Sequence, residues 1–136
     1  MRARLRFTEG LQFVGFSETG HAVLMDGDPE AGGEDSAPRP MEMLLMSLGG
    51  CSGMDVASIL RKKRQALSSL EVNLRGERAQ EHPRRFLKIE VEFVVRGKDI
   101  NEEAVARAVE LSMKRYCAVK ASLNAEVKAS YKILPE

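Results

Sequence analysis

A long apolar segment lies in the middle of this 136-residue sequence. Residues 41 to about 63 follow Pro40, a residue suited to the first turn of a helix, and their apolar side chains fall on nearly every helical face. A helix that is apolar all round is buried all round, so we expect it under a sheet and against something else, for which a second subunit is a candidate. Gly49 and Gly50 each cost about 1 kcal/mol relative to alanine, which indicates close approach of another helix or of a small substrate.

The segments before this helix alternate between apolar and polar residues, as half-buried strands do. Residues 1–7, 11–16 and 21–25 are separated by the turn sequences TEG and SETG, which predicts a three-stranded meander. Residues 26–40 are acidic and rich in glycine and proline, which predicts a loop.

The segments after it predict two strands, a second helix, a short helical piece and a last strand. Residues 87–95, in the second of these strands, alternate between apolar and polar side chains, which predicts one buried and one solvent-exposed face. The second helix is expected to open on a capping box from Asp99 to Glu102 and to run to about Tyr116. No repeat or low-complexity linker divides the chain. We therefore expect one α+β domain over residues 1–136, in the order βββ, long α, ββ, α, short α, β.

Charge and hydropathy exclude several function classes. The formal net charge of +1 argues against a protein that binds nucleic acid without sequence specificity. The N-terminal MRARLRF contains no signal-peptide core, and the uncharged run between Glu42 and Asp55 spans only 12 residues, 43 to 54. We expect a cytoplasmic protein with no nucleic-acid or membrane partner.

The two cysteines, Cys51 and Cys117, are the residues most suited to chemistry. They lie 66 positions apart without a Cys-x-x-Cys motif, and the sequence has two histidines, so we expect no metal site and in particular no structural zinc. Two distant cysteines in a reducing compartment are often unrelated buried hydrophobes, and that interpretation stays open here.

The surroundings of each thiol decide whether it reacts, because the thiolate is the nucleophile. Cys117 is expected near the N-terminus of the short helical piece, where amide dipoles favour the anion. Cys51 lies in the middle of the apolar helix, where burial disfavours the thiolate unless a cation or hydrogen-bond donors are close. Asp55 falls on the same helical face as Cys51, whereas Glu42, nine residues before Cys51, falls on the opposite side of a continuous helix.

The segment PMEMLLMSLGGCSGMDVASIL, with the later LSMKRYCAV, resembles the family of osmotically induced protein C and the organic hydroperoxide resistance proteins, and especially its YhfA-type branch. The resemblance extends over nearly the whole chain. It implies an α+β fold with two antiparallel β-sheets around two central helices, built as an intertwined homodimer.

The resemblance also implies thiol-dependent reduction of organic hydroperoxides without a cofactor. Cys51 would attack the peroxide, Cys117 would form a disulfide with it, and a dithiol reductant, lipoyl-linked in related proteins, would restore both thiols. Glu42, with Arg39 as the nearest candidate for the family's activating arginine, would assist. The chain departs from the family pattern, since Met41 separates Pro40 from Glu42 and no Arg or Lys lies between Phe7 and Pro38.

Three hypotheses follow, of which the third, a purely structural interaction domain, would make the cysteine pair a coincidence. In the first, the chain is a peroxide-reducing enzyme that uses Cys51 and Cys117. In the second, it is a noncatalytic protein of the same fold that binds a small apolar or thiol ligand or acts as a redox-sensing stress protein. The cysteine pair favours the first hypothesis, and the missing N-terminal arginine favours the second.

Overall fold

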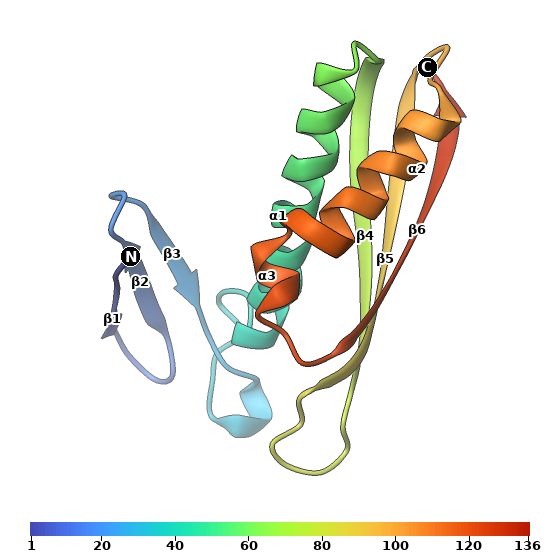
Figure 1. Ribbon diagram of the computed structural model, residues 1–136. Helices are drawn as coiled ribbons and strands as arrows, with labels where there is room; N and C mark the ends of the chain where they lie inside the picture. Colours follow the sequence, from blue (N-terminus) through green and yellow to red (C-terminus); the bar gives the residue numbers. More distant parts are fainter. The chain divides into compact units, whose positions relative to one another are not determined.

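A computed structural model of the protein describes residues 1–136 (Figure 1). The elements follow the predicted order: β1 (Ala3–Phe7), β2 (Phe13–Ser17), β3 (Ala22–Met25), η1 (Pro29–Ala31), α1 (Pro40–Lys62), β4 (Ala66–Arg78), β5 (Phe86–Lys98), α2 (Glu102–Leu111), η2 (Ser112–Tyr116), α3 (Ala118–Ala121) and β6 (Glu126–Pro135). They form two compact units, residues 1–44 and residues 45–136. The α+β class is confirmed, and the expectation of one domain stays a prediction.

The first unit contains the antiparallel meander β1-β2-β3. The chain reverses at Gly10 and Gly20, whose φ angles of 57° and 89° lie in the left-handed region that glycine adopts without strain. The strand register sets four large apolar side chains on one face, and all four are exposed: Leu5, Phe7, Phe13 and Val23. This face of the sheet therefore has no cover within the first unit.

A buried carboxylate organises the loop after β3. Asp26 is only 3% exposed and accepts hydrogen bonds from the backbone N–H groups of Gly27, Glu34 and Ser36 and from the Ser36 hydroxyl. The Ser36 hydroxyl, and after it the Gly27 N–H, lower the pKa of Asp26 to about 2. The predicted loop is thus an ordered segment, closed around one anion.

The second unit contains the sheet β4-β5-β6. Strands β4 and β5 form a long antiparallel hairpin, whereas β6 runs parallel to β5. The expectation of two antiparallel sheets is therefore wrong for this second, mixed sheet. The physical reason is that α2, η2 and α3 form a crossover between β5 and β6 and return the chain to the end where β5 began.

Within this unit α1 packs on the sheet through a narrow stripe. Its buried residues recur mainly every four positions: Leu48, Gly49, Ser52, Val56 and Leu60. A Cβ atom added at Gly49 would lie 2.6 Å from Leu74 Cδ1 of β4, so this glycine permits the close approach of helix and strand. By length and composition alone, α1 would be able to cross a membrane.

The remaining faces of α1 are not all covered. Met46 is 50% exposed and Met54 is 73% exposed. The expectation of burial on every face is therefore not met within a single chain. The outer face of the helix is exposed at these two methionines.

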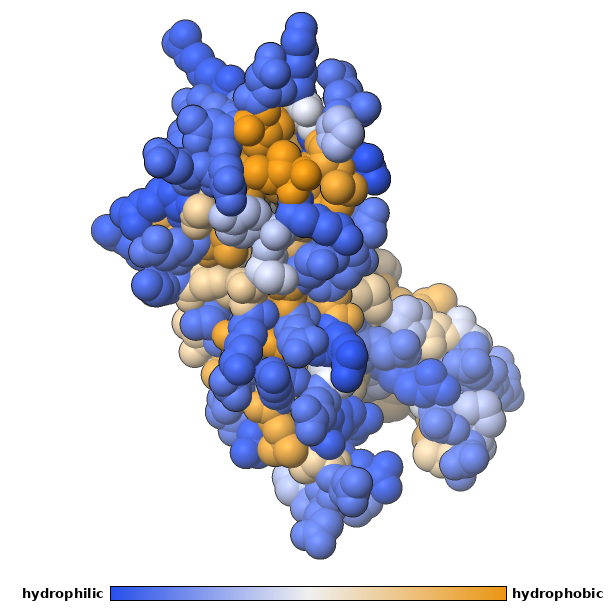
Figure 2. All heavy atoms as spheres, turned by 90° about the vertical axis from the view of Figure 1, so that its right-hand side faces the viewer, coloured by the Kyte–Doolittle hydropathy of each residue, from blue (hydrophilic) through white to orange (hydrophobic).

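Strand β5 forms the core of the second unit, as its alternation predicted. Ile89, Val91, Phe93 and Val95 are at most 1% exposed. Strand β6 is an edge strand and carries Lys128 and Lys132, charges that oppose pairing with another edge. Figure 2 shows one face of the molecule, where polar side chains cover most of the surface and apolar ones gather in patches between them.

The start of α2 differs from the predicted capping box. Asn101, not Asp99, is the N-cap, and its side chain accepts a hydrogen bond from the Ala104 N–H. Asp99 instead adopts a positive φ of 50° in the turn after β5. The helix begins two residues later than predicted because Asn is as good a cap as Asp at the position that the turn makes available.

Candidate functional site

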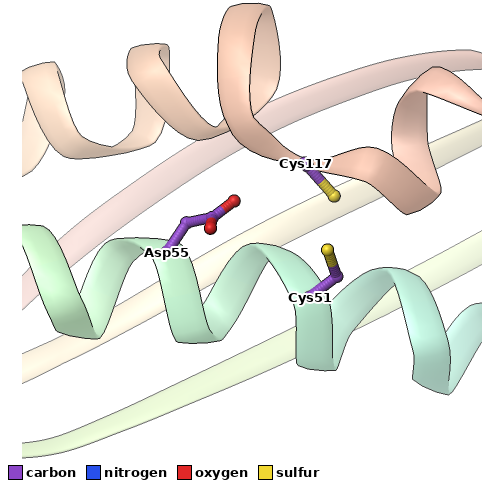
Figure 3. Close-up of side chains that lie close together, drawn as sticks. All are labelled: Cys51, Asp55 and Cys117. Atoms are coloured by element: carbon purple, nitrogen blue, oxygen red, sulfur yellow. The ribbon is translucent and has the colours of Figure 1, made fainter.

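Three side chains from two parts of the second unit meet between α1 and the segment after α2 (Figure 3). Cys51 and Asp55 project from successive turns of α1, and Cys117 lies at the junction of η2 and α3. The two sulfur atoms and a carboxylate oxygen of Asp55 all lie within 4.8 Å of one another. Both cysteines are free thiols. The structure thus brings together the two cysteines that the sequence singled out and adds Asp55 as their neighbour.

A π-helical turn, η2, directly precedes Cys117 and places it beside Cys51 and Asp55. The predicted helix to Tyr116 ends as α2 at Leu111 and continues as the wider turn η2. Ser112, which is fully buried, donates a hydrogen bond from Oγ to Asp55 Oδ2 at 2.9 Å. The Cys117 N–H donates to the Ser112 carbonyl, also at 2.9 Å. The π turn therefore links Asp55 to Cys117 through Ser112, and such turns are frequent at functional sites.

Cys117 is buried, with 4% of its surface exposed, and is the N-cap of α3. Its sulfur accepts a hydrogen bond from the Lys120 N–H at 3.4 Å, which favours the thiolate as the sequence predicted. Burial nevertheless raises the pKa of Cys117, and the neighbouring Cys51 and Asp55 raise it further. The expectation that the helix terminus favours the anion is therefore outweighed by desolvation, and Cys117 is held as the thiol.

Cys51 is the more accessible of the two thiols, since it is half-buried rather than buried. A groove of about 580 Å³ is lined by Asp55, Ile59, Leu111 and Tyr116, so it meets the cluster at Asp55 and at neither cysteine. Lys62, the last residue of α1, and Lys63 directly after it also line the groove. The groove therefore exposes the Asp55 side of the cluster to solvent.

Arg39 and Glu42 form a separate pair within the first unit. Glu42 lies in the first turn of α1, and its Oε1 accepts a hydrogen bond from the Arg39 N–H at 2.9 Å. The Arg39 guanidinium lies 3.6 Å from that oxygen, 3.4 Å from Asp35 and 3.7 Å from Asp28. Arg39 is therefore surrounded by three carboxylates, which share its charge.

Sequence reasoning missed Ser112 altogether. Nothing in a serine after an amphipathic helix signals a hydrogen bond to a residue 57 positions away. Asp55 did carry a signal, because its spacing of four residues from Cys51 sets both side chains on one helical face. Two thiols and a carboxylate can act as a redox pair or as metal ligands.

The sequence model of a family described as "OsmC-like protein" matches residues 33–132. The chain belongs to the OsmC-like family. It is 48% identical over 131 residues to protein YhfA of Escherichia coli (strain K12), covering 96% of this chain and 95% of that protein. Membership confirms the resemblance read from the motifs around Cys51 and Cys117.

Two solved structures illustrate the likeness in fold. A hypothetical protein from Aquifex aeolicus has a TM-score of 0.87 and 34% identity, covering 99% of this chain and 96% of that one. An organic hydroperoxide resistance protein from Legionella pneumophila has a TM-score of 0.69 and 15% identity, covering 96% of this chain and 95% of that one. At 15% identity, the similarity to the Legionella protein shows a shared fold.

Proposed function

We propose that the protein is a thiol-dependent peroxidase that reduces organic hydroperoxides through Cys51 and Cys117 and is recycled by a dithiol reductant. The observation that supports this most is the position of the two sulfurs, which lie within 4.8 Å of each other although their residues are 66 positions apart in the chain. A chance pair of buried cysteines has no reason to converge in this way. Family membership supports the same reaction class, since fold relatives include proteins described as organic hydroperoxide resistance proteins.

In the first step, the Cys51 thiolate attacks the peroxide oxygen that is remote from the alkyl group. The O–O bond breaks, the alkoxide leaves as the alcohol after taking up a proton, and Cys51 becomes a sulfenic acid. Cys51 is assigned this step because it is more exposed than Cys117. Burial, which raises the pKa of Cys117, makes that thiol the poorer first nucleophile.

In the second step, the Cys117 sulfur attacks the Cys51 sulfur. The S–S bond forms, the S–O bond breaks, and the hydroxyl leaves as water with the thiol proton. The sulfurs must approach from within 4.8 Å to about 2.05 Å, a movement that side-chain rotation and a small shift of η2 can supply. A dithiol of the lipoyl type then reduces the disulfide and is itself oxidised to a disulfide, which suits a reducing cytoplasm.

The groove beside Asp55 supports an alkyl or aryl hydroperoxide as substrate. The groove offers the apolar surface of Ile59, Leu111 and Tyr116 to the organic group of such a substrate. Hydrogen peroxide has no apolar group, so it gains no hydrophobic binding energy from this surface. We therefore propose that organic hydroperoxides react faster than hydrogen peroxide.

We propose that the protein acts as a homodimer. One face of the β1-β2-β3 sheet exposes four large apolar side chains, and a three-stranded sheet with an uncovered apolar face needs a partner. The outer face of α1 exposes Met46, Gly50 and Met54 at intervals of four residues. A Cβ added at Gly50 would meet nothing within 4 Å, so packing within one chain does not require a glycine at this position. A glycine here would allow a helix of a second subunit to cross α1 closely.

Arg39 and Glu42 are the proposed assisting pair, and they are also the reason for a second candidate function. Three carboxylates already engage Arg39, which leaves little of its charge for a thiolate. Without an activating cation, a dithiol reacts slowly with peroxide, which favours the noncatalytic alternative, the binding of a small apolar or thiol ligand. This noncatalytic role is the alternative that the activity measurement must separate from the first.

The test is peroxide consumption with dihydrolipoamide as reductant, using cumene hydroperoxide and hydrogen peroxide in parallel. We expect turnover by the parent protein, faster with cumene hydroperoxide, and none above background with Cys51→Ser. Cys117→Ser is the matched control, because it retains the first nucleophile and is expected to lose only intramolecular disulfide formation. Equal rates for the parent and Cys51→Ser would exclude the peroxidase and leave the noncatalytic role.

A further inference from the structure

We propose that reduced Cys51, Cys117 and Asp55 form a binding site for a thiophilic divalent cation of the Zn²⁺ class. The inference concerns binding by the resting dithiol and does not depend on the proposed peroxidase activity. It rests on three donor atoms of suitable chemistry that converge from two elements of the second unit (Figure 3).

The geometry of the three donors is close to that of a zinc site. Zn–S bonds of about 2.3 Å in a tetrahedral arrangement set two sulfurs about 3.8 Å apart. The donors here lie within 4.8 Å of one another, so a contraction of about 1 Å at most closes the site. Cys51 and Asp55 are four residues apart on one rigid helix, which fixes two of the three donors relative to each other.

Two of the three proposed metal ligands, Asp55 and Cys117, are oriented by hydrogen bonds from neighbouring groups, as metal ligands in proteins commonly are. The Ser112 hydroxyl donates to Asp55 Oδ2, which orients the carboxylate, and no hydrogen bond of the structure engages Oδ1. The Lys120 N–H donates to the Cys117 sulfur. Partners of this kind orient metal ligands and tune their donor strength.

The charge of the cluster favours a cation over a free dithiolate. Two thiolates and the Asp55 carboxylate would supply three anionic donors, which a divalent cation neutralises in part. Two thiolates select Zn²⁺ or Cd²⁺ over Mg²⁺ and Ca²⁺, which prefer oxygen ligands.

The site would be exchangeable rather than structural. Three protein ligands leave the fourth tetrahedral position to water, and the cluster is in contact with solvent, because Asp55 lines a groove and Cys51 is only half-buried. The fold also has a large apolar core around β5, so the ion is not needed to hold the chain together. Binding displaces the two thiol protons to solvent and blocks both sulfurs.

The test is titration of the fully reduced protein with Cd²⁺, followed by the ultraviolet sulfur-to-cadmium charge-transfer band, with Zn²⁺ as competitor. We expect one ion per chain. The band should be strongly reduced in both Cys51→Ser and Cys117→Ser, because each variant retains one thiolate, and Asp55→Asn should weaken binding by at least about tenfold. Glu71→Gln is the matched control, since it removes one exposed carboxylate from β4, away from the cluster, and should bind as the parent does.

Two results would overturn the site. Binding by Asp55→Asn equal to that of Glu71→Gln would show that the carboxylate is not a ligand. Non-saturating binding, or binding unchanged in Cys51→Ser, would mean an adventitious ion only. The peroxidase activity is measured separately, as turnover in metal-free buffer. Cd²⁺ binding without turnover would support the metal site and reject the peroxidase. Turnover without stoichiometric Cd²⁺ binding would support the peroxidase and reject the metal site.

Discussion

Ser112 donates a hydrogen bond to Asp55 across 57 positions of sequence, and this bond fixes the spacing of the two thiols. Asp55 lies one helical turn after Cys51, and Ser112 accepts the backbone hydrogen bond of Cys117. The contact therefore sets the register between α1 and η2. Any chemistry that needs both sulfurs depends on it.

Ser112→Ala should lower the free energy of unfolding by about 1 to 3 kcal/mol, since a hydrogen bond to a carboxylate is lost in a buried position. The substitution should also slow peroxide-driven disulfide formation, because η2 is no longer hydrogen-bonded to α1 through Asp55. Chemical denaturation measures the loss of stability, and the rate at which free thiols disappear measures disulfide formation. Ser52→Ala is the matched control: Ser52 is equally buried but donates to the Leu48 carbonyl of its own helix, so its loss should cost less and leave the disulfide rate unchanged. Identical stabilities and rates for the two variants would contradict the positioning role of Ser112.

The adjacent glycines of α1 should respond differently to alanine. In Gly49→Ala the new methyl group meets Leu74 Cδ1 at 2.6 Å, so the end of this side chain must move, and the variant should gain less stability than Gly50→Ala. In Gly50→Ala nothing lies within 4 Å, so helix stability should rise by up to about 1 kcal/mol while self-association weakens. Thermal denaturation, with light scattering for the mass, checks both. A Gly50→Ala protein that is less stable than Gly49→Ala, at concentrations where both are monomeric, would contradict the packing described for α1.

Asp26 should make the first unit sensitive to acid. Its pKa of about 2 in the folded chain lies below its usual value of 3.8, so the carboxylate stabilises the loop at any pH above about 4. That stabilisation is lost as the pH falls from 3.8 toward 2. Amide exchange at Glu34 and Ser36 should accelerate in this window, and Asp26→Asn should exchange fast at neutral pH with no such dependence. A carboxyl carbon of Asp26 that titrates at or above 3.8 would contradict the hydrogen-bonded cage.

Much of the fold follows from local patterns of the sequence. The alternation at Ile89, Val91 and Phe93 predicted a core strand, and the glycines of TEG and SETG predicted the two turns, because each signal lies within a few residues. The parallel pairing of β5 with β6 was not predictable in this way, since it depends on where the crossover returns the chain.

The candidate site likewise has a part that local sequence predicts and a part that depends on distant contacts. The spacing of Cys51 and Asp55 on one helix was readable from the sequence, as was Cys117 at the start of a short helix. Their convergence, and the buried Ser112 that holds it, depend on contacts between residues more than 50 positions apart. The balance at Cys117, where burial outweighs the helix terminus and raises the pKa, also depends on that packing.

The most direct test of the proposed reaction is a single-turnover oxidation. The reduced protein receives one equivalent of cumene hydroperoxide, and thiol titration with peptide mass mapping identifies the product. We expect the parent to lose two thiols and to yield a Cys51–Cys117 disulfide, Cys117→Ser to stop at a Cys51 sulfenic acid, and Cys51→Ser to retain its thiol. An unoxidised parent, or a Cys51→Ser variant that consumes the peroxide at the parent's rate, would contradict the assignment of these two residues.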